Sequence, residues 1–228
     1  LGEDLVGGPP VNGRVKVAER YANALHADLA IVHKRRVKGA KNQVEAKEVV
    51  YQCLPYVGIG RVYDALDVTN DVLAARGVHL PLPPQSTTTP ATRHADGLAA
   101  QKAIVGDRVD AMYAAAPAAQ LHLQRFLSAN CFGDHYTRGG LDLATRETIT
   151  FAILISLGGC EPQVKGHVAG NVNLGRDKAF LLDVITQLVP FIGYPRTLNA
   201  LACLNEVLPD AAASPTITGM MWLSLSMT

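Results

Sequence analysis

Three side chains between residues 160 and 167 have the types and the spacing to handle a proton. The segment 158–167 reads GGCEPQVKGH, in which two glycines end one helix and a Glu-Pro pair begins the next. Cys160 therefore lies at a helix N-terminus, where free backbone N–H groups and the helix dipole favour a thiolate. Gln163 and His167 follow on the same helical face. A thiol, an amide and an imidazole on one face predict a proton-handling site. The alternative is that Cys160 is a small buried side chain.

Charged side chains precede this segment. Arg146 and Glu147 stand just before the apolar run 149–157, ITFAILISL. Charged residues that border a buried helix are expected to be paired or functional, and a structural Arg–Glu pair is the alternative interpretation. A further group lies in what reads as a loop bounded by glycines, where binding residues concentrate: His135, Tyr136 and Arg138.

A segment of the chain occurs twice. Residues 52–73 read QCLPYVGIGRVYDALDVTNDVL, and residues 187–208 read QLVPFIGYPRTLNALACLNEVL, at a constant offset of 135. Such a match predicts two copies of one structural unit. Arg196 suits a carboxylate ligand through bidentate pairing. Arg61 occupies its place in the first copy, which favours a structural role instead.

The elements that must position these residues read as helices. Helices are expected over residues 43–54, 60–76, 90–104, 107–115, 118–130, 143–157, 162–174, 177–189 and 195–208, and over 14–25 in the N-terminal part. Only residues 28–33 suit a strand. Residues 78–89, with three prolines and a Ser/Thr run, predict a linker. The sequence therefore predicts an all-α body.

Composition excludes several classes of function. The 228 residues carry a formal net charge of +1, which offers no electrostatic argument for nucleic acid or a membrane. The apolar run 149–157 is too short to span a bilayer. The four cysteines show no C-x-x-C pair and no zinc spacing, so we expect no metal site and a reducing, cytoplasmic compartment.

From about Glu48 to Asp210 the chain resembles the carboxymuconolactone decarboxylase family. The motifs that carry the resemblance are EVVYQCLPYVGIGRVYDAL, FLSANCFGDHYTRGGLDLATRE, LGGCEPQVKGHVAGNVNLG and PFIGYPRTLNAL. The resemblance implies the all-helical AhpD-like fold with two repeats, the first incomplete, usually assembled as a homo-trimer or homo-hexamer. It also implies an active site of Glu147, Cys160 and His167.

The chain departs from the peroxidase members, which carry C-x-x-C before the histidine, because Gln163 replaces the second cysteine. This favours the decarboxylase branch, with loss of CO₂ from a small lactone carboxylate and no cofactor. We expect His167 to donate the proton and Glu147 to tune it. Cys160 and Gln163 would contact the lactone, and Arg138 or Arg196 the carboxylates. The alternatives are a thiol-based peroxide reductase that uses Cys160 and a non-catalytic helical assembly protein.

The first 50 residues fit a different family. Residues 12–50 resemble a fragment of ribose-phosphate pyrophosphokinase, with DLAIVHKRR as the most telling segment. The acidic loop that grips the ribose phosphate is absent, so phosphoribosyl chemistry is not expected. A genuine fusion and a misassigned stretch are both open, and we favour the second. The expected organisation is an atypical segment (1–50), the end of the first repeat (51–77), a linker (78–89), the second repeat (90–210) and a tail (211–228).

Overall fold

Residues 41–210, which the computed structural model describes, fold into helices and contain no β-strand. The all-α class predicted from the sequence is therefore confirmed for this part of the chain. The expected helix 14–25, strand 28–33 and tail 211–228 lie outside the described residues. The elements are α2 (Lys41–Gln52), α3 (Leu54–Val57), α4 (Ile59–Ala75), α5 (Arg93–Val105), α6 (Arg108–Ala115), the 3₁₀ turn η1 (Ala118–Gln120), α7 (Leu121–Phe126), the π-helix η2 (Leu127–Tyr136), α8 (Leu143–Leu157), α9 (Glu161–Asn173) and α10 (Lys178–Val207).

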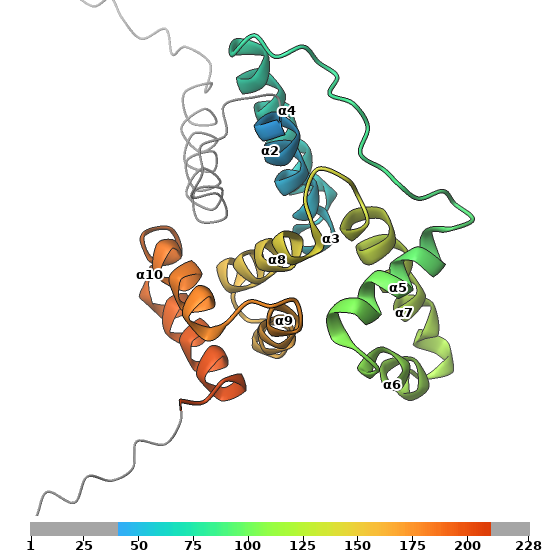
Figure 1. The fold of residues 1–228 in the computed structure, drawn as a ribbon, viewed down its shortest axis with the longest axis vertical. Helices are drawn as coiled ribbons and strands as arrows, with labels where there is room; N and C mark the ends of the chain where they lie inside the picture. Colours follow the sequence, from blue (N-terminus) through green and yellow to red (C-terminus); the bar gives the residue numbers. More distant parts are fainter. Residues whose placement is uncertain (1–40, 211–228) are drawn as a thin grey trace, which may run out of the picture.

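Helix α8 occupies the centre of the fold (Figure 1). Helices α9 and α10 pack against it and against each other, and α2 contacts it from the side of α4. Helix α5 pairs with η2, and an extended segment that contains the expected linker 78–89 leads from α4 to α5 (Figure 1). The site residues on α8, α9, η2 and α2 are thus brought together around one central helix.

Local signals explain where the central helices begin. Asp142 precedes α8, and its side chain accepts a hydrogen bond from the backbone N–H of Thr145 at 2.7 Å. Asp177 caps α10 in the same way, with 2.8 Å to the N–H of Phe180. Such caps satisfy helix N–H groups that have no partner within the helix. The apolar run 149–157 faces a core built from α8, α9 and α10, as its composition predicted.

Two glycines at equivalent places in the repeated segment share one unusual backbone conformation. Gly58 has φ 81° and ψ 159°, and Gly193 has φ 73° and ψ 168°. Glycine adopts positive φ without the steric cost that a side chain brings. Gly58 separates α3 from α4, and Gly193 kinks α10 at the matching position. This likeness supports the two-repeat interpretation, which stays a prediction.

Helices α5 and η2 cross at very short distance because glycines line the contact. A Cβ added to Gly97 would lie 2.0 Å from the carbonyl oxygen of Ser128, and one added to Gly133 would lie 2.0 Å from that of Arg93. The sequence-based expectation of a helix ending at residue 130 and followed by a loop was wrong here. The chain continues as a π-helix to Tyr136. The π-helix packs closely against α5. The hydrophobic periodicity of the sequence does not reveal such a contact between two helices.

Candidate active site

Glu147 and His167 form the centre of the candidate site. Glu147 lies on α8 with its side chain fully buried, and His167 lies on α9 with 18% of its side chain exposed. The distance between His167 Nδ1 and Glu147 Oε1 is 2.7 Å. A buried carboxylate bonded to an imidazole that keeps one edge accessible is an arrangement suited to general acid–base chemistry. The structure thus brings together two of the three catalytic residues that the sequence predicted.

Tyr136 holds the other oxygen of the same carboxylate. Its hydroxyl donates to Glu147 Oε2 at 2.9 Å, and the side chain is buried. Burial is the main cause that raises the pKa of Tyr136 well above its ordinary value, so the phenol keeps its proton. The sequence placed Tyr136 and His135 in a loop, which was wrong, because both belong to the buried face of η2. Their proposed role in binding substrate stays a prediction.

Three further residues extend the network from Tyr136, and the sequence analysis missed them. Thr150 Oγ1 lies 2.6 Å from the Tyr136 hydroxyl, and Tyr56 donates to that hydroxyl at 3.1 Å. Gln52 Nε2 donates to Thr150 Oγ1 at 3.2 Å. Gln52 and Tyr56 belong to the repeated segment at helical i, i+4 spacing, which was a usable signal. Of the repeated segments, the sequence analysis singled out only Arg196 as a binding candidate.

Arg146 pairs with Glu48 of α2 and not with its neighbour Glu147. Its Nη2 donates to Glu48 Oε2 at 3.0 Å, and its Nη1 donates to Gln52 Oε1 at 3.1 Å. The Arg146 side chain is fully buried, and this burial lowers the pKa of the guanidinium. Arg146 therefore belongs to an Arg–Glu pair, but its partner lies 98 residues away in the chain and is not the adjacent Glu147.

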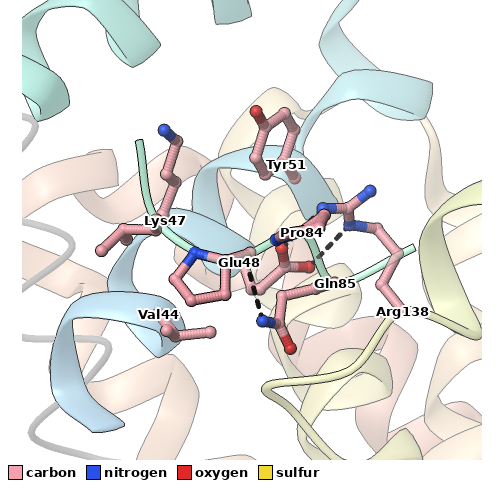
Figure 2. Close-up of a pocket in the computed structure, with 9 residues that line it drawn as sticks. Val44, Lys47, Glu48, Tyr51, Pro84, Gln85 and Arg138 are labelled. Carbon is pink, nitrogen blue, oxygen red and sulfur yellow. Dashed lines mark hydrogen bonds and ion pairs between the residues drawn. The ribbon is translucent and has the colours of Figure 1, made fainter. Parts of the chain in front are cut away.

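Arg138 also forms an ion pair with Glu48. Its Nε and Nη2 donate to the two Glu48 oxygens at 2.8 Å each, and its guanidinium stacks on the ring of Tyr51 (Figure 2). These residues border a hollow of about 60 Å³ between α2 and the linker. The lining residues are Val44, Lys47, Glu48, Tyr51, Leu82, Pro83, Pro84, Gln85 and Arg138. Arg138 thus stands at the far end of the network, with Glu48, and not beside His167.

Cys160 begins α9 as expected, yet its surroundings oppose the thiolate that the sequence suggested. Its thiol donates to the carbonyl oxygen of Leu154 at 3.2 Å, and the side chain packs against the core of α8, α9 and α10. Burial, followed by the charges of Glu161 and Cys203, raises the pKa of Cys160. Gln163 is exposed. The expected roles of Cys160 and Gln163 in contacting substrate stay predictions.

The remaining predicted binding residues, His135 and Arg196, do not belong to the hydrogen-bond network around Glu147 and His167 in the described residues. His135 is buried, and burial followed by the charge of Arg138 lowers the pKa of its imidazole. Arg196 is exposed on α10, where its Nε would lie 3.2 Å from a Cβ added to Gly158. Neither residue is joined by a hydrogen bond to Glu147 or His167 within residues 41–210.

The fold and the site define an all-helical protein with a buried carboxylate–imidazole pair between two adjacent helices. The model of the Carboxymuconolactone decarboxylase family matches residues 122–206, which contain both members of the pair. A 4-carboxymuconolactone decarboxylase from Acinetobacter baylyi is 30% identical over 92 residues, which is 40% of this chain and 68% of that protein. The chain belongs to the carboxymuconolactone decarboxylase family.

Two ribose-phosphate pyrophosphokinases are similar over shorter stretches. The enzyme of Streptomyces avermitilis is 46% identical over 66 residues, or 29% of this chain and 20% of that protein. The enzyme of Streptomyces coelicolor is 58% identical over 41 residues, or 18% of this chain and 13% of that protein. The second resemblance seen in the sequence is therefore confirmed, and the chain spans at most a fifth of either pyrophosphokinase.

The described part of the chain was also searched for membrane-spanning helices and for metal sites. None of its helices combines the length and the apolar character needed to cross a membrane. Among residues 41–210, no three side chains of His, Cys, Asp or Glu converge in the manner of a metal site.

Proposed function

We propose that this protein is a carboxymuconolactone decarboxylase-like carboxy-lyase that acts on a small lactone carboxylate. The observation that carries the proposal is the 2.7 Å bond between buried Glu147 and the partly exposed His167. The Acinetobacter relative is a 4-carboxymuconolactone decarboxylase, which suggests the substrate class. In the reaction, the bond from carbon to the carboxylate breaks, CO₂ leaves, and the electron pair delocalises into an unsaturated carbonyl as a dienolate.

His167 is then the group that returns a proton to carbon. An imidazolium held against Glu147 donates its proton to the dienolate, which yields the decarboxylated lactone and neutral imidazole. A proton from water restores the imidazolium. No metal or organic cofactor is needed in this scheme, because the conjugated carbonyl accepts the electrons. Cys160 and Gln163 would contact the lactone ring. We retain Arg138 or Arg196 as candidates for its carboxylates, and His135 as a further substrate-binding candidate.

The experiment measures CO₂ release from 4-carboxymuconolactone by the wild-type chain, His167→Ala and Glu147→Gln. General acid–base catalysis contributes typically 10²–10⁴-fold, so we expect His167→Ala to lose about that factor. The matched control is His122→Ala, since His122 is exposed on α7 and touches only the edge of Phe126 among aromatic rings. Turnover by a folded His167→Ala equal to that of the control variant would refute the proposal.

The same preparations test the thiol alternative. A peroxide reductase that uses Cys160 requires a reactive thiolate, whereas burial raises the pKa of this thiol. We therefore expect no peroxide consumption above that of a Cys160→Ser variant. Consumption that disappears in the serine variant would favour the reductase over the carboxy-lyase.

We also propose that the chain assembles with copies of itself as a trimer or hexamer. Four large apolar side chains are exposed at equivalent repeat positions: Ile59 and Tyr63 on α4, and Tyr194 and Leu198 on α10. Apolar surface left exposed in this way often marks an interface. In this scheme residues 90–210 form the repeat that carries the site and residues 51–77 form the end of the first repeat. Light scattering of the purified chain measures the assembly, and a monomer at micromolar concentration would contradict it.

A further inference from the structure

Helix α9 approaches the Glu147 carboxylate at a place where only a glycine fits. Gly170 follows His167 by three residues and so lies one turn further along the same face of α9. A Cβ added to Gly170 would stand 2.3 Å from Glu147 Oε1 and 2.7 Å from Ile104 Cγ2. Oε1 is the same oxygen that contacts His167. Glu147 Oε1 therefore occupies the space that a side chain at position 170 would need.

The carboxylate is held from its other side by Tyr136, which belongs to a cluster of hydrogen-bonded hydroxyl groups. The Tyr136 hydroxyl lies 2.9 Å from Glu147 Oε2 and 2.6 Å from Thr150 Oγ1. A phenol has one proton, and a carboxylate can only accept. The proton of Tyr136 therefore goes to Glu147, and the Tyr136 oxygen accepts from Tyr56 at 3.1 Å. A carboxylate has no proton of its own, so Oε1 is also an acceptor, and His167 is its donor.

The backbones of α8 and α9 are also fixed beside this point. Asn171 Nδ2 donates to the carbonyl oxygen of Glu147 at 3.2 Å and to that of His167 at 2.8 Å. Thr148 Oγ1 donates to Asn171 Oδ1 at 2.9 Å. A shift of α9 away from α8 would break these buried bonds, so an added side chain at Gly170 would displace the Glu147 carboxylate instead.

We infer that Gly170 and Tyr136 are positioning residues that fix His167 in one tautomer, with the proton on Nδ1 and Nε2 as the nitrogen that exchanges a proton with substrate. An accepting Oε1 requires the hydrogen atom on Nδ1, which leaves the other ring nitrogen for chemistry. This inference rests on the proposed function, because it assigns the reactive atom of the same histidine.

The experiment compares two identical substitutions on one helix. Gly166→Ala is the control, since an added Cβ there meets nothing within 4 Å. In ¹⁵N-labelled protein, two-bond ¹H–¹⁵N spectra of the neutral His167 ring, assigned by a His167→Gln variant, distinguish the two tautomers. We expect the proton on Nδ1 in the wild type and in Gly166→Ala, and a mixture of tautomers in Gly170→Ala. The kcat of Gly170→Ala should fall at least tenfold, with KM changing less.

Tyr136→Phe keeps the inference testable where Gly170→Ala fails to fold. It removes the donor to Oε2, and we expect a mixture of tautomers there too, while Tyr113→Phe, whose hydroxyl bonds to Ser128 at 2.8 Å, keeps the wild-type spectrum. An unchanged His167 spectrum in both Gly170→Ala and Tyr136→Phe would overturn the inference. The outcomes separate the two proposals, because the spectra report positioning even when His167→Ala proves fully active.

Discussion

Glu48 is the residue whose replacement should destabilise the described fold most clearly without touching Glu147 or His167. Its carboxylate is buried and accepts three hydrogen bonds from guanidinium groups: two from Arg138 at 2.8 Å and one from Arg146 at 3.0 Å. Glu48→Gln keeps the shape of the side chain and removes its charge. Fully buried Arg146 is then left without an anionic partner.

The expected cost follows from this geometry. Breaking a buried ion pair by removing one partner costs about 3–5 kcal/mol, because an uncompensated charge remains inside the protein. Arg146 retains two carbonyl acceptors, Arg138 O at 2.9 Å and Gly139 O at 2.8 Å, which favours the lower part of that range. With a urea m-value of about 2 kcal/mol per M, a loss of about 3 kcal/mol lowers the midpoint by roughly 1.5 M.

Urea unfolding followed by circular dichroism measures this shift. The control is Asp110→Asn, which neutralises a carboxylate in the exposed pair with Lys102 at 2.7 Å. Exposed pairs contribute about 0–1 kcal/mol, so the control midpoint should move little. If Glu48→Gln unfolds within about 1 kcal/mol of the wild type, the carbonyl acceptors alone satisfy Arg146, and the argument from its buried charge is refuted.

Two other predictions concern packing and pH. Gly133→Ala should lower the free energy of unfolding by about 1–3 kcal/mol through overpacking, because its Cβ would meet the Arg93 carbonyl oxygen at 2.0 Å. Gly60→Ala is the control, since its added Cβ meets nothing within 4 Å. Equal urea midpoints for the two variants would contradict the close crossing of α5 and η2. Burial raises the pKa of Cys131 from 9.0 to about 12. The unfolded thiol therefore loses its proton first, and stability should fall as pH rises from about 9 towards 12. A urea midpoint that stays level between pH 8 and pH 10.5 would count against a role of the Cys131 thiol in this pH dependence. An equal fall of the midpoint in Cys131→Ala would count against it as well.

Helix positions could be predicted from the sequence because their signals are local. Residues 143–157 were expected to form a helix, and α8 has those bounds. The expected helices 60–76 and 162–174 differ from α4 and α9 by one residue at each end. Capping residues, prolines and glycines influence the backbone only a few residues away. The amino-acid sequence therefore contains most of the information that decides a helix boundary.

The pairing of charges could not be predicted in this way. Arg146 and Glu147 are adjacent in the sequence, yet they face different partners, because neighbouring positions on a helix point in directions about 100° apart. Glu48 joins Arg146, and His167 joins Glu147. Which of two adjacent charges meets which partner depends on how α2 and α9 pack around α8.

The sequence by itself determined the helical class, because helix signals are local, and its motifs carried the family resemblance that implied Glu147 and His167. Only the tertiary structure decided that Tyr136 is buried against Glu147 and that Gly170 leaves room for the carboxylate. The physical reason is that these contacts join η2, α8 and α9 at distances of a few ångströms across long separations in the chain. Close packing between helices selects such contacts, and local propensity does not.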